Sequence, residues 1–309
     1  MLKNELQGVQ LLKGFWFRSC FFQEIATAAS IFGLNGKQLL LIDFVNYGKD
    51  FHIREEIAPM KAIKYFGLQI QKINISGMPT IVKAIDRGSP VLIGVDTYFY
   101  RIRKDLYRKE HRVHFVLVYG YNKETGMLSI VDHDHDTSYR FSKQRVSSEE
   151  IFEAEEKYRE GMCKKRYTSM LIRKVSSRGD IKNLLSACKE NLLEGINNFK
   201  EDIKLLEKLL KTGGEKLLQK SEKLGKFFFQ AAKRKHCLQY SAFIENNSAL
   251  QQLSEKSFQL FNYFKIFFYK LRKERELCFY EDNKAEILLK LDELLLVECG
   301  FFDEVLRNL

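Results

Sequence analysis

The distribution of proline is the feature of this sequence that most restricts its fold. All three prolines lie within the first 90 residues, at Pro59, Pro79 and Pro90, and none follows. Because proline interrupts helices and central strands, its absence from the rest of the chain permits long helices there. We therefore expect a mixed first domain followed by a helical second domain.

The second part of the chain has a sustained helical period. The polar segment 176–180 precedes it, and apolar residues then recur at three- and four-residue spacing: Ile181, Leu184, Leu185, Cys188, Leu192, Ile196, Phe199, Ile203, Leu206 and Leu210. This spacing is typical of an amphipathic helix. After a break at 212–214, the pattern predicts helices over 215–238, 248–276 and 282–297. We expect domains at 1–178 and 179–309, the second a helical bundle.

The first part combines helices with short apolar strands. The pattern predicts helices over 20–33 and 78–88, and strands over 91–98, 113–121, 127–131 and 166–175. Residues 122–126 have the composition of a hairpin loop. Ser147 and Glu150 form a capping box that opens a helix ending near Gly161. The sequence therefore predicts an α+β domain with an antiparallel sheet.

Charge and cysteine content indicate which partners and which cellular compartment to expect. The 309 residues include 51 Lys and Arg against 40 Asp and Glu, a net charge of +11, which favours acidic partners. The six cysteines lie at 20, 163, 188, 237, 278 and 299, and no pair has metal-site spacing. Free thiols in a reducing cytosol are the simplest interpretation. Residues 1–14 lack an apolar signal segment, and no apolar run is long enough to span a membrane, so we expect a cytoplasmic location.

Three residues far apart in the sequence carry the chemistry that we expect. Cys20 opens a helix, His114 opens an apolar strand, and Asp132 follows the next strand. A thiol, an imidazole base and a carboxylate that orients the base together form a nucleophilic site. Each residue also has a plainer interpretation. Cys20 could be a buried structural thiol, His114 a polar group at the sheet margin, and Asp132 a turn residue.

Two other segments allow more than one interpretation. The run of alternating Asp and His at 132–136 has ligand types that suit a divalent ion. We favour a polar turn that carries one catalytic Asp, and we expect no metal. The aromatic stretch 258–271 favours a core or a helix interface. A membrane-surface helix is the alternative, because Lys265, Lys270 and Arg272 flank it.

Several blocks occur in an order that resembles a known family. They are 88–96, 114–121, Val131 with Asp132, and 152–154, together with the Cys20 helix and the segment 46–51. Over about residues 10–175 this layout is similar to the family of the butirosin biosynthesis protein H N-terminal domain. The resemblance implies a papain-like cysteine peptidase fold adapted to acyl transfer. By this resemblance we expect transfer of an acyl or aminoacyl group from an acyl carrier protein thioester to an amine.

The resemblance also implies roles for individual residues. Cys20 would be the nucleophile, His114 the base and Asp132 the orienting group. Related leader-cleaving peptidases place a Gln six residues before the Cys, where this chain has Gly14. The expected oxyanion donors are therefore Gln10 or Gln23, or backbone N–H groups at the helix start. Apart from the resemblance, we expect Trp16, Phe17 and Tyr98 to contact the substrate, with core packing as the alternative for Trp16 and Phe17.

The sequence leaves three classes of function open. We favour an acyltransferase that acts on a carrier-bound thioester and an amine acceptor. A cysteine peptidase or amidase of the same fold is the alternative, as is a non-catalytic scaffold. The expected partners are an acidic acyl carrier protein and a small-molecule amine, with no nucleic acid, no cofactor and no transmembrane segment. The role of the helical domain and the oligomeric state stay open.

Overall fold

The structure is a computed structural model of the chain. It describes residues 1–11, 20–36, 47–53, 63, 66–134, 140–162, 168–175, 189–238, 247–274 and 278–308. The chain divides into two compact units. The first comprises Met1–Leu40 with Ile63–Asp180, and the second comprises Leu41–Ala62 with Ile181–Leu309.

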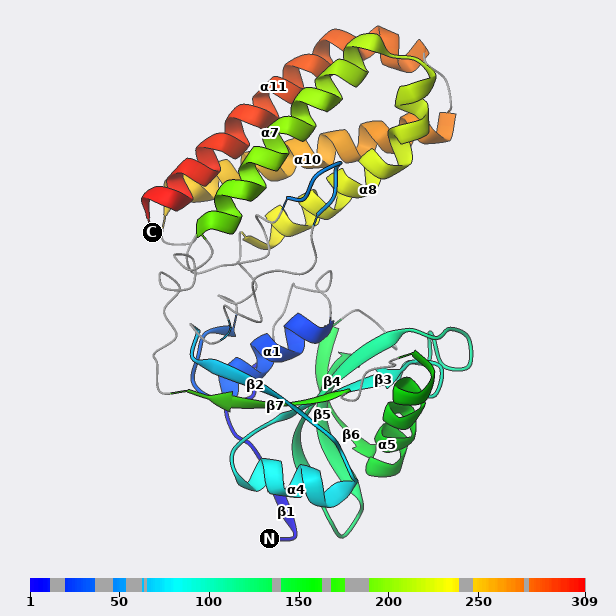
Figure 1. The fold of residues 1–309 in the computed structure, drawn as a ribbon, viewed down its shortest axis with the longest axis vertical. Coiled ribbons are helices and arrows are strands. Elements are labelled where there is room, and N and C mark those ends of the chain that lie inside the picture. Colours follow the sequence, from blue (N-terminus) through cyan, green and yellow to red (C-terminus); the bar gives the residue numbers. More distant parts are fainter. Residues whose placement is uncertain are drawn as a thin grey trace. The chain divides into compact units, whose positions relative to one another are not determined.

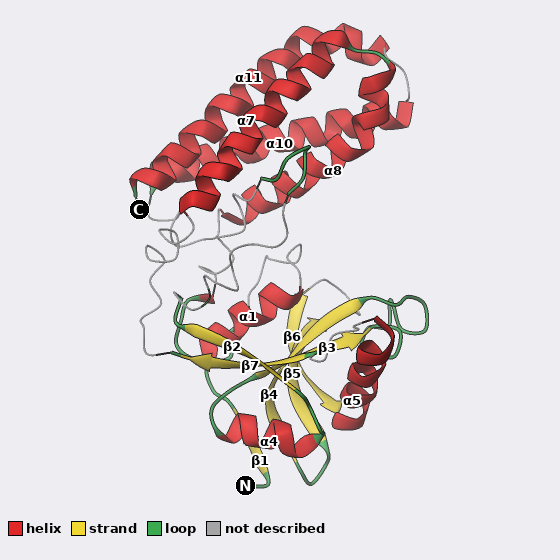
Figure 2. Ribbon diagram, in the orientation of Figure 1, coloured by secondary structure: helices red, strands yellow, loops and turns green. Residues whose placement is uncertain are grey.

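The first unit is an α+β domain built on one antiparallel sheet (Figures 1 and 2). Its described strands are β1 (Lys3–Glu5), β2 (Leu68–Ile73), β3 (Val91–Asp96), β4 (Val113–Asn122), β5 (Met127–Asp134), β6 (Arg140–Ser147) and β7 (Ser169–Lys174). Six of them follow the order β2-β7-β3-β4-β5-β6, and β1 pairs with the end of β4. The fold class expected from the sequence is confirmed.

Helices cover the sheet and bury its central strands. They are α1 (Cys20–Ile31), α4 (Met78–Asp86) and α5 (Ser148–Lys157), the last continuing into a π-helical turn over Tyr158–Met162. Strand β3 is buried along its whole length, as its continuous apolar run indicates. Apolar residues of α4 and α5 share one core with β3, β4 and β5. Helix α1 packs against β4, which places residue 20 beside the start of that strand.

The structure confirms some of the predicted helices and strands and corrects others. The hairpin between β4 and β5 and the Ser147 cap of α5 are confirmed; Ser147 Oγ accepts from the N–H of Glu149 at 3.2 Å. Strands β1, β2 and β6 were not expected. Strand β6 is an edge strand whose sequence RFSKQRVS gives little apolar signal. Strand β5 extends to Asp134, so Asp132 lies within a strand and pairs with Ser142, and the predicted turn at that residue is wrong.

Among its described residues, the second unit has four long helices, and Figure 1 shows them. They are α7 (Lys189–Thr212), α8 (Glu215–Leu238), α10 (Ser248–Glu274) and α11 (Cys278–Arg307). Helix α11 is longer than the predicted 282–297. The aromatic residues Phe261, Phe264, Phe267 and Phe268 of α10 are buried in the shared apolar core, which confirms the core interpretation for them.

A short segment from the first third of the sequence belongs to this helical unit. Residues 47–53 contribute Tyr47, Phe51 and Ile53 to its core. The carboxylate of Asp202 accepts the backbone N–H groups of Asp50 and Phe51, at 3.0 and 2.6 Å. The expected ranges 1–178 and 179–309 placed this segment in the first domain. The structure instead packs it among the helices, because its aromatic side chains find their apolar partners there.

Buried charges also join this segment to the helices. The Oε1 atom of Glu298 lies 2.7 Å from the Nζ atom of Lys235, and both side chains are fully buried. The Tyr47 hydroxyl donates to Glu298 Oε2 at 2.8 Å, and the hydroxyl of Ser257 contacts the same carboxylate.

Within the described ranges, no helix is both long enough and apolar enough to cross a bilayer.

Candidate active site

Cys20 is the first residue of α1, and its sulfur contacts the start of β4. The backbone N–H of Phe115 donates to Cys20 Sγ at 3.3 Å, and the Cys20 side chain hydrogen-bonds to that of His114. The residue is partly exposed. A sulfur at a helix N-terminus also lies near the positive end of the helix dipole, which favours the thiolate.

His114 is the second residue of β4, and its ring is buried. Its Nε2 atom lies 2.6 Å from Oδ1 of Asp132, on the neighbouring strand β5. Since Nε2 is occupied by this bond, Nδ1 is the ring nitrogen that remains for the sulfur of Cys20. The structure therefore brings together the three side chains that the sequence analysis singled out.

Asp132 is fully buried, and both of its oxygens have partners. Oδ1 bonds to His114, and Oδ2 accepts the hydroxyl hydrogen of Tyr100 at 2.7 Å. A carboxylate held on both oxygens has a fixed orientation, which it passes to the imidazole. Tyr100 is itself buried, directly beyond β3. Sequence reasoning did not assign it a role, although it lies in the Tyr-rich stretch that follows Asp96.

The electrostatics of the site favour an ion pair between sulfur and imidazole. Burial alone would raise the pKa of Cys20, but the His114 charge, the bond to His114 and the Phe115 N–H outweigh burial and lower it. Burial alone would lower the pKa of His114, but the charges of Asp132 and Cys20 outweigh it and raise the pKa to about 10. A lowered thiol pKa beside a raised imidazole pKa is the arrangement of an activated cysteine.

Arg103 is a further charged residue at this site that the sequence analysis missed. Its Nη1 atom lies 3.4 Å from Nδ1 of His114. Asp105 holds the opposite edge of the guanidinium through bonds of 3.0 Å to Nε and 2.8 Å to Nη2. The cation therefore faces the ring nitrogen that serves the sulfur. The only sequence signal was the basic loop in which Arg103 lies.

Glu24 is a second residue that the sequence analysis missed. It lies one turn after Cys20 on α1 and is fully buried, and it is the only charged residue of that helix. Neither carboxylate oxygen has a hydrogen-bond partner among the described residues. Burial and the neighbouring Asp132 and Cys20 raise the pKa of Glu24 well above its ordinary value. Its surroundings therefore disfavour the charged form of the carboxyl group beside the anions of the site.

The predicted oxyanion donors have different positions. The backbone N–H of Gln10 donates to Ser30 Oγ at 2.9 Å, near the C-terminal end of α1. Cys20 is at the other end of this helix, roughly 15 Å away at 1.5 Å per residue. Gln10 is therefore separated from the sulfur. Gln23 is only 1 % exposed and lies on the buried side of α1, and its role stays a prediction.

The predicted substrate-contacting residues are only partly described. Trp16 and Phe17 lie outside the described residues. Tyr98 is partly buried, and its ring stacks on that of His111 at 4.3 Å between centroids. The side chain of His111 is 56% exposed, and its Nδ1 atom contacts the buried carboxylate of Asp96 at 2.7 Å.

No metal site is found in the described part of the chain, where no cluster of three or more His, Cys, Asp or Glu side chains has suitable geometry. His135 and Asp136, which the alternative metal interpretation needs, lie outside the described residues. The choice between a metal site and a polar segment for 132–136 therefore stays a prediction. The contacts of Asp132 with His114 and Tyr100 account for that residue without a metal.

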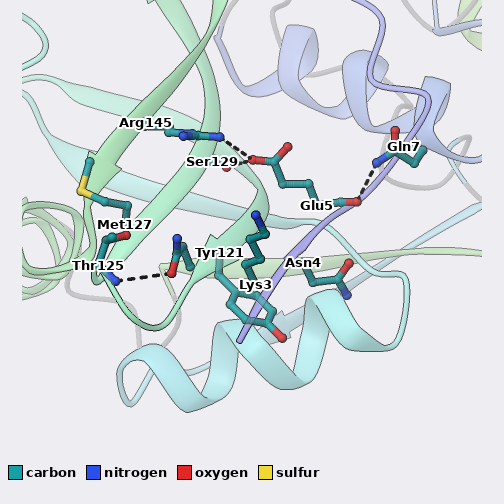
Figure 3. A pocket seen from close by; sticks show the side chains of 10 residues that line it. Lys3, Asn4, Glu5, Gln7, Tyr121, Thr125, Met127, Ser129 and Arg145 are labelled. Carbon is teal, nitrogen blue, oxygen red and sulfur yellow. Dashed lines mark hydrogen bonds and ion pairs between the residues drawn. The ribbon is translucent and has the colours of Figure 1, made fainter. Parts of the chain in front are cut away.

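A separate polar hollow lies at the other end of the sheet (Figure 3). Its volume is about 630 Å³, and its lining includes Lys3, Glu5 and Arg145. Glu5 accepts from the Ser129 hydroxyl at 2.5 Å and lies 3.6 Å from a guanidinium nitrogen of Arg145. Tyr121, which also lines the hollow, is seven residues along β4 from His114, about 20 Å at the rise of a strand. This hollow is therefore distinct from the Cys20 site.

Comparisons with known proteins give limited information. No family model matches the chain, and no curated protein matches it. Among solved structures, the chain is similar to one from Bacillus anthracis described as a "putative C39-like peptidase", at 16% identity and a TM-score of 0.36. The alignment covers 57% of this chain and 99% of that chain. A similarity this low carries no argument about activity, so the case for the site rests on its own geometry.

Proposed function

We propose that this protein is a cysteine-dependent acyltransferase. The observation that carries the proposal is the continuous set of contacts from Cys20 Sγ through His114 to Asp132, with a bond of 2.6 Å between the last two. Such an arrangement supplies a thiolate, a proton carrier and a group that orients the carrier. The site is best suited to reactions that pass through an acyl-cysteine.

The first half-reaction forms the acyl-enzyme. The Cys20 thiolate attacks the carbonyl carbon of a thioester, and a new C–S bond to the enzyme forms as the bond to the leaving sulfur breaks. The leaving thiolate takes the proton from His114 Nδ1, while Asp132 stabilises the imidazolium until then. The Cys20 N–H at the start of α1 is a candidate oxyanion donor, since helix N-termini carry unpaired N–H groups.

The second half-reaction transfers the acyl group to an amine. The amine nitrogen attacks the acyl-cysteine carbonyl carbon, and His114 accepts the proton that the nitrogen loses. The C–S bond to Cys20 then breaks, an amide is released, and the thiolate–imidazolium pair is restored. Protons and electron pairs balance over the cycle, and no oxidant or reductant is needed.

The position of Arg103 supports a thioester donor over a peptide. Its guanidinium lies 3.4 Å from His114 Nδ1, the atom that serves the leaving group. A cation there stabilises a leaving thiolate, which is an anion, whereas it offers nothing to a neutral leaving amine. The net charge of +11 further favours an acidic carrier protein as the donor. A peptidase or amidase uses the same three residues and is the alternative.

Intact-protein mass spectrometry tests the proposal. The protein is incubated with a panel of acyl and aminoacyl pantetheine thioesters, without an amine. We expect a mass gain equal to one acyl group, absent in Cys20→Ala and retained in Cys299→Ala, which removes the other described free thiol. Adding primary amines should discharge the adduct and yield the amide. Cleavage of peptides with no adduct from any thioester would favour the peptidase alternative.

A further inference from the structure

A surface of the helical unit combines exposed apolar side chains with cations. Helices α8 and α10 lie against each other (Figure 1). A groove of about 370 Å³ is lined by residues of both helices. Phe229 on α8 and Ile266 and Tyr269 on α10 are 42, 45 and 65% exposed. We call these three residues and the groove that they line the α8–α10 patch. Large apolar groups on two adjacent helices indicate an interaction surface.

Positive charges surround this patch. Lys226 and Lys233 come from α8, and Lys265 and Arg272 from α10. Glu222 is the only acidic residue that lines the groove, and it already contacts two of these cations, Lys226 at 2.7 Å and Arg272 at 3.7 Å. The surroundings of the patch are therefore complementary to a negatively charged partner.

Lys233 joins the cations around the patch directly to one of its apolar side chains, Phe229. The Nζ atom of Lys233 lies 3.9 Å from the centroid of the Phe229 ring. The Lys233 ammonium therefore lies over the face of an exposed aromatic ring of the patch, in a cation–π contact. Partial burial and the nearby Lys265 lower the pKa of Lys233, so an anion at this position would be stabilised.

We propose that the α8–α10 patch binds the surface of an anionic lipid membrane. The exposed aromatic and aliphatic side chains would enter the boundary between headgroups and acyl chains, and the cations on both helices would contact lipid phosphates and carboxylates. A flat anionic surface satisfies both rows of cations together. The three apolar side chains protrude from both helices, which also favours a surface over a single partner helix. This inference is independent of the proposed acyl transfer.

Vesicle co-sedimentation of the full chain tests the proposal. We expect binding to vesicles of phosphatidylcholine mixed with phosphatidylserine and much weaker binding to phosphatidylcholine alone. Rising salt should weaken the binding, because salt screens the charges. Phe229→Ser with Tyr269→Ser, and separately Lys233→Glu with Lys265→Glu, should each reduce the partition coefficient roughly tenfold or more.

Matched variants on other helices serve as controls. Leu289→Ser with Leu296→Ser removes exposed apolar groups from α11, and Lys204→Glu with Lys208→Glu reverses exposed charges on α7. These variants should bind like the wild type. Far-UV circular dichroism confirms that each variant keeps its helices. No binding to anionic vesicles, equal binding to neutral vesicles, or equal loss in the control variants would each overturn the proposal.

Discussion

The Nε2 atom of His114 and the Oδ1 atom of Asp132 lie 2.6 Å apart, and both side chains are sealed from solvent. The bond joins neighbouring strands at the end of the sheet where α1 begins. Because Asp132 also holds the hydroxyl of Tyr100, the imidazole is oriented by a carboxylate that cannot rotate freely. The predictions below follow from this arrangement and from the buried contacts of the helical unit.

Tyr100→Phe should weaken both stability and activity. The change keeps the ring but removes the bond of 2.7 Å to Asp132, and bonds to charged groups contribute about 1.5–3 kcal/mol. We expect unfolding free energy to fall by about 2 kcal/mol and acyl-enzyme formation to slow roughly tenfold. Urea titration measures the unfolding free energy. Mass spectrometry of samples quenched at successive times measures the rate of acyl-enzyme formation.

Tyr121→Phe is the matched control for that change. The Tyr121 hydroxyl donates to Asp86 at 2.8 Å, but Asp86 is at the surface and far from Cys20. We expect a loss under about 1 kcal/mol and no change in acylation. Equal effects of the two substitutions on acylation would show that the Tyr100 bond does not serve the site.

Stability should depend on the protonation of His114. Folding raises its pKa from 6.5 to about 10, so its stabilising contribution is complete below pH 6.5 and is lost as the pH rises toward 10. The lowered pKa of Cys20 acts in the opposite sense, with a contribution that is lost as the pH falls. The two contributions oppose each other, so we expect the pH dependence of wild-type stability to be weaker than that of His114 alone.

Removing the thiol should uncover the His114 contribution. In Cys20→Ala, Asp132 still raises the pKa of His114. The unfolding free energy of Cys20→Ala should exceed that of the double variant that also carries His114→Gln. This difference should shrink as the pH rises above about 6.5. Denaturant titrations over a pH series measure it. An advantage that grows with pH would contradict the assignment of the charged imidazole.

Asp202→Ala should destabilise the helical unit through the segment 47–53. The Asp202 carboxylate accepts two backbone N–H groups, and both residues that supply them, Asp50 and Phe51, have positive φ angles of 58° and 54°. Residues other than glycine rarely adopt positive φ angles without such support. We expect a loss of about 2–4 kcal/mol, against less than about 0.5 kcal/mol for the exposed neighbour in Glu201→Ala.

The pair Lys235 and Glu298 should show strong coupling. Both side chains are fully buried, so removal of one leaves an uncompensated charge in the core. We expect Lys235→Met and Glu298→Gln each to cost about 3–5 kcal/mol, and the double variant to cost clearly less than their sum. The exposed pair Lys256 and Glu293, at 2.9 Å, should couple by less than about 1 kcal/mol. Additive costs at the buried pair would contradict the burial of its charges.

The spacing of apolar residues predicted the helices and strands that contribute apolar side chains to a core. The α8 and α10 helices follow from their apolar spacing and from the glycines and serine at their starts, and the β4–β5 hairpin follows from continuous apolar runs. Strand β6 was missed because only Phe141 and Val146 of its residues are apolar, as is common in an edge strand. The position of residues 47–53 depends on contacts with helices about 150 residues later, which no local pattern contains.

The residues of the candidate site also fall into those that the sequence predicted and those that it missed. Cys20, His114 and Asp132 were found because their residue types belong to one chemistry. Tyr100, Arg103 and Glu24 were missed because their roles depend on closeness in space. Tyr100 matters through a single bond to Asp132, and Glu24 through burial that only the packed fold creates. The backbone of Gln10 contacts Ser30, at the end of α1 away from Cys20, and no local sequence pattern contains this contact.

The rate of Cys20 alkylation by iodoacetamide as a function of pH tests the central claim most directly. Peptide mapping separates Cys20 from Cys299, whose pKa burial raises. If His114 stabilises the thiolate, Cys20 will react rapidly near neutrality, with a midpoint well below that of an ordinary thiol at about 8.5, and His114→Gln will move the midpoint upward. A Cys20 midpoint at or above that of an ordinary thiol, unchanged in His114→Gln, would contradict the account.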